Sequence, residues 1–211
     1  MKKGIFIVFE GPDGSGKSTQ AEMLYNSLSD EGYSCIITQE PGGTHEGQKM
    51  REILLDPKLK ICPKSELFLF LADRAEHVER IIHPSLKEGK IVICSRYFYS
   101  TLVYQGIARQ ITDFKFLEKM NLFAVGGKQP DIVFYLDVLP ERGLPNAMNT
   151  SSSFKGGDRI EREGVHFQER VREGYLKLAT HYRKIFVVIK NGPIDEIQKT
   201  VYTLTKRRLS A

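Results

Sequence analysis

Short apolar segments alternate along the chain with longer segments whose apolar positions recur every three or four residues. The short segments are built largely from β-branched and aromatic residues, which favours strands that are buried on both faces. Such strands are expected at Ile5–Glu10, Ser34–Thr38, Ile91–Cys94, Ile132–Leu136 and Phe186–Ile189. The longer segments between them predict helices.

The first expected helix places Ala21, Leu24 and Leu28 on one face and ends before Gly32, which suits a helix C-terminus. The expected helices are Ser18–Glu31, Glu46–Leu55, Lys64–Glu88 with a bend near Pro84, Ser100–Tyr104, Asp113–Val125, Gln168–Tyr182 and Asp195–Lys206. Strands that alternate with helices predict an α/β fold, with a parallel sheet covered on both faces. The small polar stretch Asn146–Gly157 is expected to be a mobile loop within one domain, residues 1–211.

Composition narrows the class of protein. A chain of 211 residues with 41% hydrophobic and 27% charged residues is typical of a globular domain, which excludes a disordered or disulfide-stapled chain. No apolar run reaches the roughly 18 residues that a membrane helix needs. The N-terminus begins like a secretory signal, but its apolar stretch is short and runs directly into a glycine-rich loop, so it predicts a first strand.

Charge and cysteine content bear on location and partners. The three cysteines are scattered, without a CxxC pair, which favours a reduced cytoplasmic protein without structural zinc. The net charge of +5 suits an enzyme that handles phosphates and is weak evidence for nucleic acid. We therefore expect neither nucleic acid nor a membrane as partner.

The strongest local motif is GPDGSGKS, which matches the phosphate-loop pattern GxxxxGK[ST] between an expected strand and an expected helix. The residues expected to bind ATP are Gly11, Pro12, Asp13, Gly14, Ser15, Gly16, Lys17, Ser18 and Thr19. Lys17 would reach the β- and γ-phosphates, and Ser18 would ligate Mg²⁺. The alternative is a glycine-rich turn with a chance lysine. The motif does not separate kinases from GTPases and ATPases, although the NKxD signal of GTPases is absent.

Further segments, in order and spacing, resemble the bacterial type of the thymidylate kinase family. They are FEGPDGSGKST (9–19), EPGGT (40–44), REILL (51–55), ELFLFLADRAEH (66–77), RYFYSTLVYQG (96–106), PDIVFYLD (130–137) and DRIEREGVHFQERVREGYLKLA (158–179). The resemblance implies a P-loop kinase fold with a five-stranded parallel sheet and a short lid at about residues 146–165. It implies transfer of the γ-phosphoryl group of ATP to dTMP with Mg²⁺, usually in a homodimer.

The resemblance also assigns residues to dTMP. The implied substrate-binding residues are Asp13, Arg51, Phe70, Arg74, Arg96, Tyr97, Thr101, Tyr104 and Gln105. Phe70 and Arg74 share a helix face and resemble the thymine pocket, whereas Arg51 and Arg96 resemble the arginines that hold the substrate phosphate. Simpler roles remain open: a turn for Asp13, core packing for Phe70 and the tyrosines, and surface ion pairs for the arginines.

Three departures from the family pattern bear on catalysis. Ser95 replaces the aspartate of the common DRY sequence, Gln39 replaces an arginine before EPGGT, and Tyr99 stands where an aspartate is frequent. Because a carboxylate at position 95 would help to organise Mg²⁺ or its waters, Ser95→Asp is expected to raise the rate or to tighten the dependence on Mg²⁺. The resemblance also implies a bent, often cis, peptide at Glu40-Pro41.

The resemblance implies that a catalytic arginine lies either in the phosphate loop or, in the bacterial type, in the lid, and the loop contains no arginine between Gly11 and Gly16. Residues 146–154 are not basic, which leaves Lys155, Arg159 and Arg162. Arg159 is the first choice, which makes the expected catalytic residues Lys17, Arg96 and Arg159. The alternative is that these lid charges form a solvated surface.

Two other polar positions are set aside. Asp137 closes an apolar strand and looks like a metal ligand, but the family places this strand further from the phosphates, so Ser18 is the expected metal ligand. Glu10 is expected to be structural. Two further hypotheses stand beside a dTMP kinase: a degenerate relative that binds nucleotides with weak transfer activity, and a kinase for dUMP or another pyrimidine monophosphate.

Overall fold

The fold is a computed structural model that describes residues 4–150, 154 and 157–210. A five-stranded sheet lies at its centre, with β1 (Ile5–Glu10), β2 (Cys35–Gln39), β3 (Ile91–Ser95), β4 (Ile132–Asp137) and β5 (Phe186–Lys190). All neighbouring strands pair in parallel in the order β2-β3-β1-β4-β5. The five strands and the parallel α/β class predicted from the sequence are confirmed.

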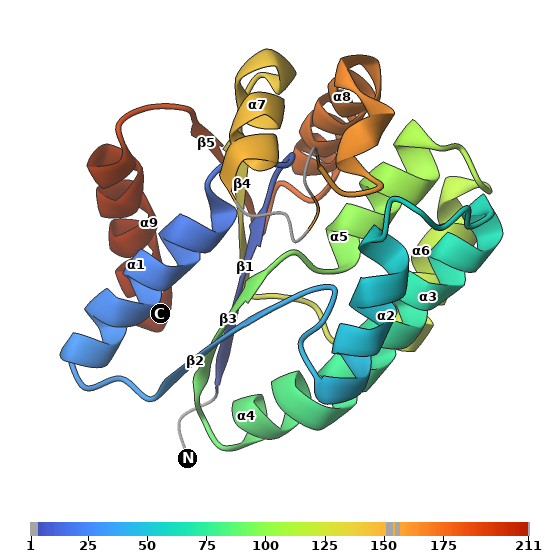
Figure 1. The fold of residues 1–211 in the computed structure, drawn as a ribbon. Coiled ribbons are helices and arrows are strands. Elements are labelled where there is room, and N and C mark those ends of the chain that lie inside the picture. The colour runs from blue at the N-terminus through green and yellow to red at the C-terminus, as the bar shows by residue number, and fades with distance from the viewer. Residues whose placement is uncertain (1–3, 151–153, 155–156, 211) are drawn as a thin grey trace.

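Helices cover both faces of the sheet (Figure 1). Their bounds are α1 Lys17–Asp30, α2 His45–Leu55, α3 Pro63–His77, α4 His83–Lys87, α5 Phe98–Thr101, α6 Phe114–Ala124, α7 Pro140–Thr150, α8 Val165–His181 and α9 Ile194–Leu209. On β1, Phe6 and Val8 pack into the core beneath α3, α6 and α8, whereas Ile7 and Phe9 pack beneath α1 and α9. This alternation explains why the strand is almost wholly apolar.

The single helix expected over residues 64–88 is three consecutive segments. Helix α3 leads into a π-helical turn, Val78–Ile82, and then into α4. Pro84 lies in the first turn of α4 and has no amide hydrogen to donate, and the nearby chain closes with a wider bond from His83 N to Val78 O. The expected bend near Pro84 is therefore a change of helix type just before the proline.

The expected loop over residues 146–157 begins as helix. Helix α7 runs from Pro140 to Thr150 and contains Pro145 in its interior. Residues 151–153 and 155–156 of the predicted lid, with Lys155 among them, lie outside the described residues, and the mobility of the lid stays a prediction. Beyond it, Glu161–Glu163 forms one 3-10 turn before α8.

The described part of the chain contains no helix both long and apolar enough to span a membrane.

Candidate functional site

The phosphate loop connects the end of β1 to the start of α1. Strand β1 is the central strand, with β3 on one side and β4 on the other. Gly11, Gly14 and Gly16 have φ of 153°, 70° and 86°, a backbone region that favours glycine. A Cβ on Gly14 would also lie 1.9 Å from the carbonyl oxygen of Gly143. The loop therefore needs glycine both for its turn and for the close approach of α7.

Lys17 closes the loop at the first residue of α1. Its Nζ donates to the Pro12 carbonyl at 2.6 Å and to Ser15 Oγ at 3.3 Å. Burial, together with the nearby charge of Arg96, lowers the pKa of Lys17 to about 7. Ser18 and Thr19 follow in the first helical turn and are exposed. This helix end thus offers a lysine, hydroxyls and free amide hydrogens to an anion.

A cleft with a volume of about 100 Å³ lies beside this loop. Its lining residues come from the phosphate loop, the segment after β2, α2, α3, the end of β3 with α5 and the π-helical segment Leu102–Ala108, and the segment before α8. They are Asp13, Glu40, Pro41, Arg51, Leu55, Phe70, Arg96, Ser100, Thr101, Tyr104, Gln105, Asp158 and Ile160. Seven of the nine predicted substrate residues are among them. The geometry therefore brings these seven together, whereas their roles toward a ligand stay predictions.

The floor of the cleft is an ion pair between the phosphate loop and the end of β3. Arg96 Nη2 lies 2.5 Å from Asp13 Oδ1, and the Tyr104 hydroxyl lies 3.2 Å from the same guanidinium nitrogen. Gln168 Nε2 of α8 donates to Asp13 Oδ2 at 3.3 Å. Burial opposes ionisation of Asp13, but the charges of Arg96 and Lys17 outweigh it and lower the pKa of Asp13. Arg96 has φ 68°, unusual for a side chain of this size.

Glu10 organises the residues under this floor. Its carboxylate accepts from the amides of Tyr97 and Ser100 at 3.0 and 3.1 Å, and from the hydroxyls of Ser100 and Tyr175 at 2.7 Å each. Burial raises the pKa of Glu10 despite these bonds and the charge of Arg96. Glu10 thus has the structural role expected from the sequence, but its partner Tyr175, like Gln168, was not singled out, because no local pattern links α8 to β1.

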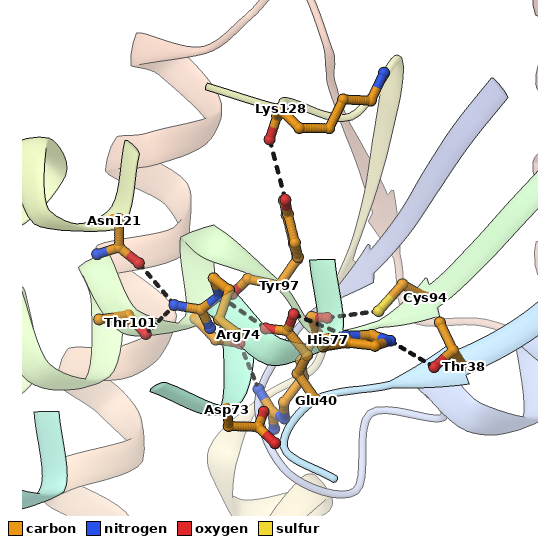
Figure 2. Close-up of polar contacts among 12 residues, drawn as sticks. Thr38, Glu40, Asp73, Arg74, His77, Cys94, Tyr97, Thr101, Asn121 and Lys128 are labelled. Carbon is orange, nitrogen blue, oxygen red and sulfur yellow. Dashed lines mark hydrogen bonds and ion pairs between the residues drawn. The ribbon is translucent and has the colours of Figure 1, made fainter. Parts of the chain in front are cut away.

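The EPGGT segment is held by three side chains of α3 (Figure 2). Arg74 Nε and His77 Nδ1 lie 2.8 and 3.0 Å from the two oxygens of Glu40, and Asp73 Oδ1 accepts from the amide of Gly42 at 2.9 Å. The Glu40-Pro41 peptide is cis, as the resemblance implied. Arg51 Nη1 donates to the Pro41 carbonyl at 2.9 Å, so the arginine that reaches the cleft also binds the bent segment.

Arg74 lies behind the cleft rather than in its wall. It is 1% exposed, and its guanidinium donates to Glu40, to Thr101 Oγ1 at 2.7 Å, to Asn121 Oδ1 at 2.7 Å and to the Tyr97 carbonyl at 3.0 Å (Figure 2). The geometry thus makes Arg74 a support for Thr101, and the direct contact to a base that the resemblance implies stays a prediction.

Tyr97 is also behind the cleft, since it is fully buried and its hydroxyl donates to the Lys128 carbonyl at 3.0 Å (Figure 2). Its ring packs edge-on against Phe6, with centroids 4.8 Å apart. This environment fits the packing role that is the simpler alternative for the tyrosines, and a contact of Tyr97 to substrate stays a prediction.

Arg159 is bound away from the phosphate loop. Its Nη1 lies 2.6 Å from Glu66 Oε2, its Nε donates to the Leu54 carbonyl at 2.8 Å, and its backbone amide donates to the Leu55 carbonyl. These contacts anchor the residues before α8 to the C-terminal end of α2. A catalytic role for Arg159, which stays a prediction, would require breaking this buried ion pair. Arg162 donates through Nε to the Gly157 carbonyl.

The departures from the family pattern have distinct structural settings. Ser95 and Gln39 are register partners on β3 and β2, so the two replaced charges lie side by side at the carboxyl ends of adjacent strands. Tyr99 is fully buried and packs edge-on against Phe186 and Tyr182, which makes it a core residue. Its environment therefore differs from that of the other two.

The donor set around the loop limits how a metal ion would bind. Within the described residues, no group of three or more His, Cys, Asp or Glu side chains is placed to hold a metal. Asp137 is held by Arg172 through two bonds of 2.6 and 2.9 Å, which supports its omission from the metal set. The exposed hydroxyl of Ser18 fits a Mg²⁺ ion that takes most ligands from phosphate oxygens and water.

Comparisons with known proteins agree with this arrangement. The family model for thymidylate kinase matches residues 9–201. The chain is 46% identical over 198 residues to a thymidylate kinase of Desulfosudis oleivorans, with 92% of each chain covered, and 42% identical over 204 residues to one of Halothermothrix orenii, with 97% of each covered. The crystal structure of thymidylate kinase from Ehrlichia chaffeensis matches with a TM-score of 0.79 at 32% identity, covering 96% of this chain and 99% of that one. The chain therefore belongs to the thymidylate kinase family.

Proposed function

We propose that this protein transfers the γ-phosphoryl group of ATP to dTMP, giving dTDP and ADP. Membership of the thymidylate kinase family supports the reaction. The observation that carries the proposal is the position of the cleft: Asp13 and Arg96 join it directly to the phosphate loop. An acceptor in the cleft and a donor on the loop would therefore be neighbours, as transfer in one step requires.

ATP would bind through the loop. The amides of Gly11–Thr19 and the N-terminal end of α1 would bind its phosphates, and Lys17 would move from its contact with Pro12 to the β- and γ-phosphates. Ser18 would contribute to Mg²⁺, which neutralises phosphate charge when bound. The preference for ATP over other triphosphates rests on the family alone.

The monophosphate would lie in the cleft with its base toward α3. Phe70 would pack on the ring, and Thr101 and Gln105 would contact its edge. Asp13 and Tyr104 would lie against the sugar, and Arg51 and Arg96 would bind the phosphate as planar, bidentate donors. Because Arg96 pairs with Asp13 in this structure, it is already oriented on the floor of the cleft.

Transfer would proceed by positioning and charge neutralisation. An oxygen of the dTMP phosphate attacks the γ-phosphorus, the bond to the bridging oxygen breaks, and ADP leaves with the electron pair. The attacking oxygen is already anionic, so neither a general base nor a covalent intermediate is required. Lys17 and Arg96 would supply positive charge beside this path.

A coupled ADP-release assay tests the proposal. With ATP, Mg²⁺ and a panel of dTMP, dUMP and dCMP, we expect turnover that depends on dTMP and is abolished in Lys17→Met. Turnover with another monophosphate but not with dTMP would change the acceptor. Bound ATP and dTMP by calorimetry, without turnover, would instead favour the degenerate relative that Ser95 and Gln39 suggest.

We further propose that the protein is a homodimer in the cytoplasm. Large apolar side chains are exposed on the outer faces of α3 and α6, with Phe68 59%, Phe116 54% and Phe123 91% exposed. Between the two helices lies a groove lined by Ala72, Ala75, Glu76, Val78, Phe123, Ala124 and Val125, among others. A patch of this kind suits a second copy of the chain, in keeping with the family. The free thiols of Cys35, Cys62 and Cys94 suit a reducing compartment.

A further inference from the structure

A buried carboxylate, Glu66 of α3, lies next to the cleft and is not accounted for by the proposed reaction. It is 1% exposed, and its carboxylate is in contact with three donor side chains. Gln105 Nε2 and Arg109 Nε each donate to Oε1 at 2.8 Å, and Arg159 Nη1 lies 2.6 Å from Oε2. Glu66 thus joins the cleft residue Gln105 to the segment that precedes α8.

The chemistry of this contact fixes how the Gln105 amide is turned. A carboxylate that is paired with two guanidiniums has no hydrogen to donate and accepts only. The NH₂ group of Gln105 must therefore face Glu66 and donate one of its two hydrogens to it, which leaves the amide oxygen as the acceptor for a ligand in the cleft that Gln105 lines. With a neutral residue in place of Glu66, either end of the amide would serve.

Thr101, one helical turn earlier, is fixed in the complementary sense. Arg74 Nη1 donates to Thr101 Oγ1 at 2.7 Å, so the hydroxyl oxygen is already an acceptor and its hydrogen remains to be donated. Thr101 also lines the cleft. This wall of the cleft therefore presents the Gln105 amide oxygen as an acceptor beside the Thr101 hydroxyl as a donor. The pair matches the edge of a pyrimidine that carries a ring N–H next to a carbonyl.

We propose that Glu66 is a positioning residue that makes Gln105 a hydrogen-bond acceptor and thereby selects pyrimidines with N3–H, thymine and uracil, against cytosine. Cytosine has a lone pair at N3, and two acceptors would face each other if its ring took the same place. The inference rests on the proposed function, because it assumes that a pyrimidine monophosphate occupies the cleft.

Arg159 stabilises the buried cluster around Glu66. Together with Arg109 it compensates the buried charge of Glu66, and its backbone and Nε bonds to Leu55 and Leu54 fix the segment in place. A buried carboxylate with one partner removed is strongly unfavourable, so the two arginines maintain the acceptor-only state on which the Gln105 orientation depends.

A double-mutant cycle tests the proposal. Dissociation constants for dTMP, dUMP and dCMP are measured by calorimetry, with kcat and KM in parallel, for wild type, Glu66→Gln, Gln105→Met and the double variant. We expect Glu66→Gln to reduce the preference for dTMP over dCMP about tenfold, the worth of about one hydrogen bond. The preference for dTMP over dUMP and the KM for ATP should stay within about twofold of wild type.

The cycle separates positioning from general support. If Glu66 acts through Gln105, Glu66→Gln will have no further effect on base preference in the Gln105→Met background, whereas additive effects would overturn the proposal. Unchanged preference in either single variant would also overturn it. Glu163→Gln is the matched control: it removes the carboxylate 2.8 Å from Arg109 Nη2 without contacting Gln105, and should leave the preference intact.

Two safeguards keep the outcome clear. If Glu66→Gln does not fold, Glu66→Asp replaces it, because it keeps the charge but shortens the reach to Gln105 and should weaken the base preference in the same direction. If wild type binds the nucleotides without turning them over, the proposed reaction fails, while the ratios of dissociation constants still decide the role of Glu66.

Discussion

Lys17 shows how a single residue can couple the phosphate loop to pH. Its pKa is lowered to about 7 by burial and by Arg96, so near neutral pH much of it is uncharged in the free protein. A triphosphate in contact with Nζ would favour the charged form and raise this pKa. Binding of ATP should therefore be accompanied by uptake of a proton above about pH 7.

We predict that the dissociation constant for ATP rises with pH between about 7.5 and 9, by up to about tenfold per pH unit. The protonated lysine is the form that binds, and its fraction falls as the pH passes the pKa of the free protein. Calorimetry in buffers of different ionisation enthalpy measures the proton uptake directly. Lys17→Arg is the control, since arginine keeps its charge over this range; the same pH slope in that variant would contradict the assignment to Lys17.

At the same scale, the sequence predicts residues that belong to a motif and misses those that act across the fold. Asp13, Arg96 and Tyr104 were found because they lie in recognisable segments, and the structure brings all three to the cleft. Gln168 lies in the recognised segment 158–179, but its bond to Asp13 joins positions 155 residues apart and is visible only in the folded chain. Arg74 was recognised, but only packing shows that Thr101 and Glu40 take up its donors.

At the scale of elements, the departures on β2 and β3 act as a pair. Gln39 and Ser95 are register partners, Gln39 is exposed and Ser95 is 8% exposed. An aspartate placed at position 95 alone would lie beside residues 10 and 40, both buried glutamates at the same edge of the sheet. An arginine at position 39 would supply the balancing charge as well as a cation toward the phosphates.

We predict that Gln39→Arg/Ser95→Asp raises kcat by about tenfold over Ser95→Asp alone, about 1.4 kcal/mol of transition-state stabilisation. Ser95→Asp itself is expected to raise the rate or tighten the dependence on Mg²⁺. The measurement is kcat as a function of Mg²⁺ for wild type, both single variants and the double variant. A double variant no faster than either single would show that the site has adapted around the neutral pair.

The secondary structure was predictable wherever apolar periodicity specified it. All five strands were found to within one or two residues, because each is a short apolar run between polar turns. Helix α7 is not predicted, because its second half falls in the small polar stretch from Asn146 that predicts a loop. What holds α7 is tertiary: Gly143 lies against the phosphate loop, where a Cβ would come within 2.7 Å of the Asp13 carbonyl oxygen.

At the scale of the whole molecule, α3 has two faces with different functions. Its inner face carries Glu66, Asp73, Arg74 and His77, which hold the cleft and the EPGGT segment. Its outer face carries the exposed Phe68, and residues of α3 and of the end of α6 line the groove described above. Burying that groove against a second copy would place the two clefts on either side of a shared helical layer.

We predict that the wild-type protein has twice the 24.1 kDa mass of one chain in solution, and that Phe123→Asp has the mass of one chain. Phe123 is 91% exposed, so the substitution costs little within one chain, whereas a desolvated carboxylate at an apolar interface is strongly unfavourable. Light scattering coupled to gel filtration measures the masses, with far-UV circular dichroism to verify folding. Ile194→Asp is the matched control, because Ile194 is 57% exposed on α9, across the sheet from the groove, and its variant should remain dimeric. A monomeric wild type, or a dimer that persists in Phe68→Asp/Phe123→Asp, would place the subunit contact elsewhere or remove it.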